Sequence, residues 1–257
     1  MLVVVTLAFF LISPITRALF LLAATVMAVF EMCRALGKME LKCTKWVLYI
    51  ASAVEAILLY FNVELIYIAV VFFLAIFACL TGGILSKDIR GKGALASLAV
   101  LVYPVVPLLA IFKLALIDKW VPVFLIGCLS AWACDAFALF GGMLFGKHKI
   151  APEVSPNKTL EGCISGAVFS VVAGVLFYFV LRSSYNIPLV CCMVTALVCS
   201  TFGQFGDLAA SLIKRMTGVK DYSNLIPGHG GVMDRVDSLL FSIPTAYFCL
   251  FIAGVLH

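Results

Sequence analysis

The sequence predicts an all-α, polytopic integral membrane protein, and two features of the chain lead to this fold class. First, 64% of the 257 residues are hydrophobic and only 12% are charged, whereas soluble domains carry about 25% charged residues. Second, apolar runs close to the roughly 20 residues that a helix needs to cross a bilayer recur along the whole chain. We expect about eight or nine transmembrane helices with polar loops between them.

The expected spans follow one another with little chain between them. Eight apolar runs are long enough, at residues 17–33, 46–61, 64–80, 95–116, 121–145, 162–181, 187–205 and 239–256. The opening stretch MLVVVTLAFFLI is a short possible ninth span. Because no basic residue precedes Arg17 and no small-residue cleavage site is evident, we expect a retained helix rather than a signal peptide.

The basic residues divide unevenly among the loops. Most of the 18 Lys and Arg residues fall in four alternate loops, at residues 31–45, 81–93, 146–161 and 206–238. Because basic loops stay on the cytoplasmic side of a membrane, we expect all four there. We expect no nucleic-acid partner for this charge.

No repeat, linker or low-complexity tract divides the chain, so we expect one membrane domain over residues 1–257. Its N-terminal helices occupy residues 1–120, and the polar, chemistry-bearing segments lie in residues 121–257. The ten cysteines lie mostly within spans and form no CxxC pair. This pattern argues against metal-thiolate or disulfide chemistry and favours packing roles.

The most polar segment lies near the C-terminus. In QFGDLAASLIKRMTG, Asp207, Ser211 and Lys214 share one face of an expected helix that Gly218 ends. After KDYSNLIPGHGG, a new helix is expected at MDRVDSLLFSI, with Asp234 and Asp237 in its first turn.

Two interpretations of Asp207, Asp234 and Asp237 remain open on spacing alone. They could be solvated or helix-capping carboxylates, or they could bind Mg²⁺, which prefers oxygen ligands together with substrate phosphates. The adjoining GHGG favours the second interpretation, because glycines let backbone amides approach a phosphate. His229 could donate to the same phosphate, but it has no second His or Cys nearby to form a metal site.

Three other features of the sequence bear on function. GGMLFGKH at 141–148 nearly matches a P-loop, but it ends in His148 and follows a span rather than a strand, so we reject that assignment. Asp135 lies deep in an apolar span, where burying an ionisable group costs free energy, so a functional role is the favoured interpretation. The same argument applies to Glu55 with less weight. SPNKT, at 155–159, predicts a turn closed by its proline and a helix start at Thr159.

These residues together resemble the phosphatidate cytidylyltransferase family, also called CDP-diacylglycerol synthases. SLIKRMTGVKDYSNLIPGHGGVMDRVD, residues 211–237, fits the family signature throughout. DAFALFGGMLFGKHKIAPEVSPNKTLEG, residues 135–162, is a second similar block, and FEMCRALGK at 30–38 is a weaker third. Many members have an acid before the signature serine, whereas this chain has Ala210, so metal assignments that depend on that acid are not carried over.

The resemblance implies transfer of a cytidylyl group from CTP to phosphatidic acid, with Mg²⁺ as cofactor and phospholipid biosynthesis as the context. It implies metal binding by Asp207 and Asp234, a bacterial-type inner (plasma) membrane with the active site facing the cytoplasm, and a possible homodimer. We expect catalytic roles for Asp207, Asp234, Asp237, Lys214 and Arg215, and substrate binding by Asp135, Ser155, Lys158, Thr159, Ser211, Lys220, Asp221, His229, Gly230, Gly231 and Arg235.

Two alternatives are kept beside this interpretation. One is a related CTP-dependent enzyme that acts on an isoprenoid lipid or phosphorylates a lipid alcohol. The other is a membrane transporter in which Asp135 and Glu55 form an ion path, although the sequence lacks a matching pair of interrupted helices in two halves. CDP-alcohol phosphotransferases are excluded because the chain has no DGxxAR segment.

Overall fold

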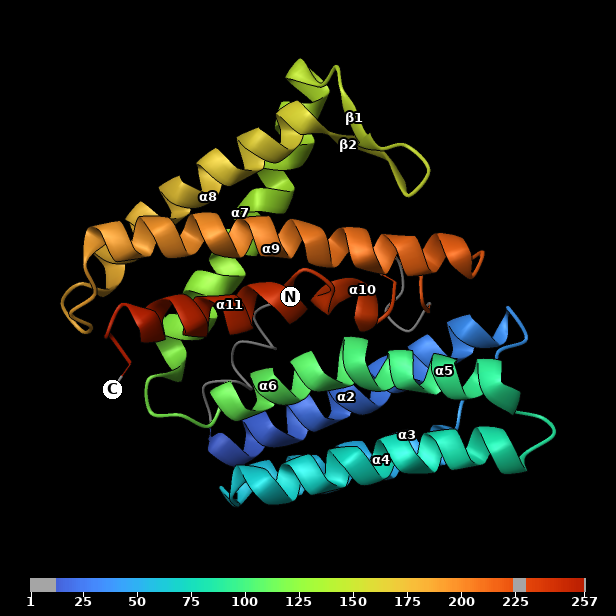
Figure 1. The fold of residues 1–257 in the computed structure, drawn as a ribbon. Helices are drawn as coiled ribbons and strands as arrows, with labels where there is room; N and C mark the ends of the chain where they lie inside the picture. Colours follow the sequence, from blue (N-terminus) through green and yellow to red (C-terminus); the bar gives the residue numbers. More distant parts are fainter. Residues whose placement is uncertain (1–12, 224–229, 257) are drawn as a thin grey trace. The chain divides into compact units, whose positions relative to one another are not determined.

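Helices account for most of residues 13–223 and 230–256, which are the part of the chain described by this computed structural model (Figure 1). The chain forms two compact units. The first combines residues 1–117 with 217–234, and the second combines residues 118–216 with 235–257. The expectation of a single membrane domain stays a prediction.

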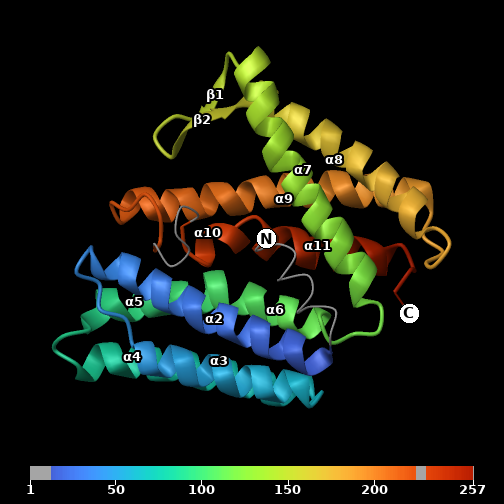
Figure 2. The ribbon, with the colours of Figure 1, turned by 180° about the vertical axis from the view of Figure 1, so that it is seen from behind.

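The first unit is a group of packed helices. They are α2 (Pro14–Gly37), α3 (Lys45–Tyr60), α4 (Leu65–Leu85), α5 (Arg90–Val100), the π-helical turn η1 (Leu101–Val105) and α6 (Val106–Leu114). The first of them begins where the chain dictates it: Ser13 caps the helix, accepting from Thr16 N at 3.2 Å, and Pro14 follows at a position that needs no donor. Figure 2 shows α3 and α4 side by side.

A proline explains the π turn within the first unit. α5, η1 and α6 form one continuous helical segment from Arg90 to Leu114. Pro104 lies inside η1 and has no backbone N–H for the α-helical ladder, so the local hydrogen-bond pattern widens to a π turn. The segment remains long enough to cross a membrane.

The surface of α4 is suited to lipid. Of its 21 residues only Ala75 and Cys79 are buried, while large apolar side chains such as Phe73 and Phe77 are exposed. In water such an apolar surface would need a covering partner, whereas in a bilayer the lipid tails cover it.

The second unit contains four long helices and a small hairpin. Its elements are α7 (Trp120–Phe145), β1 (Lys149–Ala151), β2 (Ser155–Thr159), α8 (Leu160–Leu181), α9 (Leu189–Met216) and α11 (Leu239–Ile252). A short helix, α10 (Met233–Val236), lies where the chain passes from the first unit to the second. The strands pair antiparallel, with Lys149 opposite Thr159 and Ala151 opposite Ser155.

Small residues bring α7 and α8 close together at the end that carries the hairpin (Figure 1). Gly162 and Gly166 are four residues apart on α8, a spacing that lets two membrane helices approach closely. A Cβ atom at Gly166 would lie 2.7 Å from the Cys134 carbonyl oxygen on α7, and one at Gly162 would lie 2.6 Å from that of Ala138. The two helices therefore approach closely next to the hairpin that connects them.

The predicted fold class is confirmed, with two differences in detail. All eight expected spans are helical, and seven helical segments in the described part of the chain are long and apolar enough to cross a membrane. The remaining one, α3, has 16 residues and is shorter than these. The possible ninth span at residues 1–12 lies outside the described residues.

The second difference concerns SPNKT. The prediction of a turn there is wrong: these residues form β2, because the turn lies earlier, at 152–154, and SPNKT returns antiparallel to β1. The predicted helix start is confirmed, since Thr159 caps α8 by accepting from Gly162 N at 3.1 Å. The predicted helix through Asp207 is also confirmed, as a continuation of α9 to Met216, after which Gly218 adopts a φ of +68°.

Candidate functional site

An ion pair between α9 and β2 forms the centre of the candidate site in the second unit. Lys158 Nζ lies 2.6 Å from Asp207 Oδ2, and the two side chains are 19% and 28% exposed. Lys158 is placed by the strand that follows the hairpin turn, and Asp207 by the last third of α9. The pair is thus shielded from water without being fully buried.

Two more carboxylates and a second lysine lie around this pair. Asp135 on α7 is within electrostatic range of both Asp207 and Lys158. Asp237, buried at the break between α10 and α11, is within range of Asp207, Asp135 and Lys214. We call these five residues the acidic cluster. The cluster thus joins three carboxyl groups, which can bind a cation, to two lysines, which can bind an anion.

The hairpin is held against the end of α9 by a second contact. Arg215 Nε donates to the Val154 carbonyl oxygen at 3.1 Å, one residue before the start of β2. Ser155 is half-buried at the first position of β2, and Ser211 is half-buried one turn after Asp207. Thr159 is buried and its hydroxyl serves as the cap of α8, which gives it a structural role.

Glu161 closes the corner between α7 and the hairpin. Its Oε2 accepts from the backbone N–H groups of Lys147 and His148 at 3.0 and 3.2 Å, and its Oε1 lies 2.6 Å from His148 Nδ1. These are the amides that a P-loop would turn toward a phosphate. The rejection of a P-loop in GGMLFGKH is confirmed, because these residues continue the helix α7 as far as Phe145, so the segment follows a helix and not a strand.

The first unit contains the other part of the predicted site. Asp234 Oδ2 accepts from Tyr222 N at 2.9 Å and from Gly231 N at 3.0 Å. This carboxylate therefore joins the two ends of the chain segment that separates α9 from α10. Gly230 has a φ of +80°, which favours glycine, and a Cβ there would lie 3.1 Å from Asp234 Oδ2.

These contacts bear on the expectation that GHGG presents amides to a phosphate. The Gly231 amide donates to Asp234 in this structure, so the glycines allow a carboxylate to approach the backbone. Binding of a phosphate by Gly230 or Gly231 stays a prediction. His229 lies outside the described residues. Lys220 and Asp221 are described, and both are exposed.

The structure thus brings together some of the predicted residues within each unit. Asp135, Lys158, Asp207, Lys214 and Asp237 gather in the second unit, and Gly230, Gly231 and Asp234 gather in the first. Arg235 is exposed on α10 in the second unit. Because Asp207 and Asp234 belong to different units, their joint role in binding a metal stays a prediction.

The acidic cluster has the donor chemistry that Mg²⁺ prefers. Its three carboxylates supply hard oxygen ligands. Within the described residues, no group of three or more His, Cys, Asp and Glu is arranged to hold a metal ion by itself. Binding of Mg²⁺ stays a prediction.

One residue of the first unit with an evident structural role was not predicted from the sequence. Glu31 on α2 is completely buried and accepts hydrogen bonds from Ser223, Val232 and Met233. It lies in FEMCRALGK, the block with the weakest resemblance to the family. A glutamate within an apolar span was the available signal.

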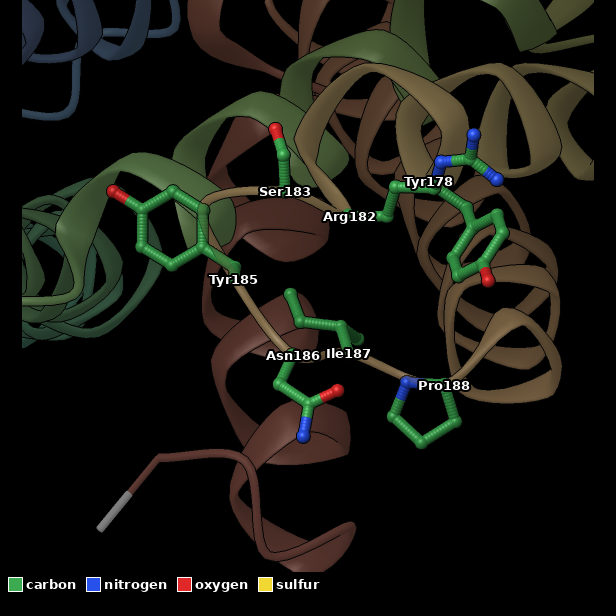
Figure 3. A pocket seen from close by; sticks show the side chains of 7 residues that line it. All are labelled: Tyr178, Arg182, Ser183, Tyr185, Asn186, Ile187 and Pro188. Atoms are coloured by element: carbon green, nitrogen blue, oxygen red, sulfur yellow. The ribbon is translucent and has the colours of Figure 1, made fainter.

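An open cavity lies elsewhere in the second unit. It has a volume of about 460 Å³ and is lined by the end of α8 and the connection to α9, including Tyr178, Arg182 and Tyr185 (Figure 3). Tyr178 follows Thr159 by 19 residues, so about 28 Å of helix separates this cavity from the cap at Thr159. We therefore assign the candidate site to the acidic cluster, where the charged groups converge.

A family model described as "Cytidylyltransferase family" matches residues 1–253. The chain is 45% identical over 123 residues to the phosphatidate cytidylyltransferase of Bacillus subtilis (strain 168), covering 48% of this chain and 45% of that protein. It is 43% identical over 116 residues to that of Staphylococcus haemolyticus (45% and 44% covered) and 43% over 117 residues to that of Staphylococcus aureus strain COL (45% and 44%). Each alignment spans less than half the length of the relative.

Proposed function

The chain belongs to the cytidylyltransferase family, and from this premise we propose that it transfers the cytidylyl group of CTP to phosphatidic acid, giving CDP-diacylglycerol and pyrophosphate. The observation that carries the proposal is the acidic cluster around the ion pair of Lys158 and Asp207. The relatives named phosphatidate cytidylyltransferase give the substrate class.

The reaction is limited by charge rather than by a weak nucleophile. In the proposed step, a phosphate oxygen of phosphatidic acid attacks the α-phosphorus of CTP, and the bond between the α-phosphorus and the bridging oxygen to the β-phosphate breaks. A phosphate monoester already carries about −1.5 to −2 charges at neutral pH, so no strong general base is needed. The enzyme must instead reduce the repulsion between two polyanions and hold them in line.

The cationic residues meet the first requirement. Lys158 and Lys214 lie in the acidic cluster, and Arg215 lies at the end of the same helix as Lys214. In the resting protein Lys158 is paired with Asp207. We propose that an incoming phosphate takes over Lys158, since a lysine ammonium binds phosphate as a point charge.

The carboxylates are the proposed ligands of the metal ion. We propose that Asp207 and Asp234 hold Mg²⁺, with Asp135 and Asp237 contributing negative charge nearby. The ion, when bound, supplies charge neutralisation on the CTP phosphates and on the leaving pyrophosphate. Asp234 would then combine this role with its hydrogen bonds to Tyr222 N and Gly231 N.

The protein is an integral membrane protein, which suits a reaction between a lipid and a soluble nucleotide. We propose that the basic loops and the site face the cytoplasm, as the charge distribution favours. On this basis CTP approaches from the cytosol and the phosphatidic acid headgroup from the membrane surface. A plasma membrane of bacterial type and a homodimer belong to the same proposal.

Release of pyrophosphate by purified protein in detergent tests the function. We expect turnover with CTP, Mg²⁺ and phosphatidic acid together, and none when any one of them is omitted. The same assay with an isoprenoid ether phosphate or a lipid alcohol as acceptor separates the related enzymes. Turnover only with such an acceptor would contradict phosphatidic acid as the substrate, and ion or solute uptake by vesicles without any CTP turnover would point to a transporter.

A further inference from the structure

Glu31 is a carboxylate buried within the first unit that has several hydrogen-bond donors. It lies on α2 with no exposed surface. Its Oε1 accepts from Ser223 Oγ at 2.5 Å and from Val232 N at 2.9 Å, while its Oε2 accepts from Met233 N at 2.7 Å. Both oxygens are therefore engaged, and their partners lie about 190 to 200 residues away along the chain.

The donors belong to the two ends of one segment. Ser223 is on the incoming side, and Val232 and Met233 are on the outgoing side, directly before Asp234. Asp234 makes its own pair of bonds across the same two ends, to Tyr222 N and Gly231 N. We call Tyr222, Ser223 and residues 231–233 the neck.

The two carboxylates thus accept hydrogen bonds from the neck on different sides, and we call this pair of contacts the clasp. Glu31 approaches it from α2, whereas Asp234 belongs to the chain that leaves it. Because Met233 N is the first helical amide of α10, Glu31 also satisfies a donor that has no partner within the helix. Asp234 is the next residue along the chain.

Gly231 provides a second observation that points to the same clasp. A Cβ atom at this position would lie 2.5 to 2.6 Å from the carboxylate atoms of Glu31. Any side chain at residue 231 would therefore displace the carboxylate from the neck. Glycine is needed here to admit Glu31, independently of any contact with substrate.

We propose that Glu31 is a positioning residue that fixes the neck and, through it, Asp234. This inference rests on the proposed function, because the residue that Glu31 positions, Asp234, is itself proposed to bind Mg²⁺. Glu31 itself touches neither substrate nor metal. Its carboxylate is required as an acceptor for three donors, which a glutamine amide can match only in part.

Kinetics as a function of Mg²⁺ concentration test this role. We expect Glu31→Ala to lower kcat by about 10 to 100-fold and to raise the Mg²⁺ concentration for half-maximal rate, as is typical when the support of a metal ligand is lost. Glu31→Gln should fall between Ala and wild type, because its amide oxygen retains part of the acceptor set. Glu55→Gln is the matched control: Glu55 is also buried, on α3 of the same unit, and should leave the Mg²⁺ requirement unchanged.

A purely structural role predicts a different pattern. In that case Glu31→Gln would lower the yield or the Tm, while the folded fraction recovered by size exclusion kept the kcat and Mg²⁺ dependence of wild type. That result would overturn the proposal. A raised Mg²⁺ requirement in folded protein, graded from Gln to Ala, is the supporting result.

A measurement without turnover separates this inference from the proposed function. Hydrogen exchange of a peptide covering residues 231–236 reports the amides of Val232 and Met233 directly. We expect faster exchange in Glu31→Gln than in Glu55→Gln. If wild type is inactive with CTP and phosphatidic acid, the proposed function fails, and the clasp is still decided by exchange: unchanged exchange in Glu31→Gln overturns it.

Discussion

Replacing Lys158 by Met tests the electrostatics of the acidic cluster. The substitution removes the partner that lies 2.6 Å from Asp207 and leaves that carboxylate beside Asp135 and Asp237. Two unit charges 4 Å apart attract by about 4 kcal/mol at an effective dielectric constant near 20. Because the side chains are 19% and 28% exposed, water and lost side-chain freedom reduce this, and we expect about 2 kcal/mol of destabilisation.

A second substitution, Asp207→Asn, makes the test specific, because it should stabilise the Lys158→Met variant. Asp207→Asn removes a negative charge from among its neighbours, so Lys158→Met with Asp207→Asn should regain most of the stability that Lys158→Met alone loses. At about 2–4 °C per kcal/mol, the single variant should lower the Tm by about 4–8 °C. Lys158→Met and the double variant should both lose turnover by at least about 10²-fold, since Lys158 is proposed to bind a phosphate and Asp207 to bind Mg²⁺.

Thermal unfolding in detergent, followed beside pyrophosphate release, measures both effects. Lys149→Met, on β1 of the same hairpin, is the control for the loss of a lysine, and its Tm and turnover should stay close to wild type. The reasoning is refuted if Lys158→Met unfolds at the wild-type temperature. It is equally refuted if the double variant is no more stable than Lys158→Met.

Three further predictions follow from particular contacts. Gly231→Ala should destabilise the protein by about 1–3 kcal/mol in thermal unfolding, because the new Cβ clashes with the Glu31 carboxylate. Gly37→Ala is the control and should be tolerated, since no atom lies within 4 Å of the added carbon. Equal losses of stability in the two variants would contradict the clash. Thr159→Ala should cost about 1 kcal/mol through loss of the cap on Gly162 N, and Thr159→Ser should restore the Tm. Chelation of divalent ions should abolish pyrophosphate release and added Mg²⁺ should restore it; full activity in excess chelator would exclude the metal.

The helical plan of the chain was predictable because hydropathy determines it. In a bilayer the backbone must satisfy its own hydrogen bonds, so each apolar run has to become a helix. The prediction of a helix carrying Asp207 and Lys214 also succeeded, since their spacing repeats at the period of a helix and Gly218 marks its end. Short elements were less predictable: the turn expected at SPNKT is a strand, because pairing with β1 decides its conformation.

The candidate site was predictable in composition but not in its contacts. Asp135 was predicted as an ionisable group deep in an apolar span, and Asp207 and Lys214 were predicted from their spacing on one helical face. Local spacing could not show that Lys158, from the hairpin, pairs with Asp207 on α9. Nor could it show that Glu31 reaches the neck about 190 residues later, because such pairings arise only when distant helices pack.

The central claim, transfer of a cytidylyl group to phosphatidic acid, is tested most directly by which phosphate of labelled CTP enters the lipid. Purified protein is incubated with phosphatidic acid, Mg²⁺ and CTP labelled on either the α- or the γ-phosphate, and the lipid is then extracted. Cytidylyl transfer predicts that the α-label enters the lipid while the γ-label is released as pyrophosphate. Entry of the γ-label into the lipid, or of neither label, would contradict the proposed reaction.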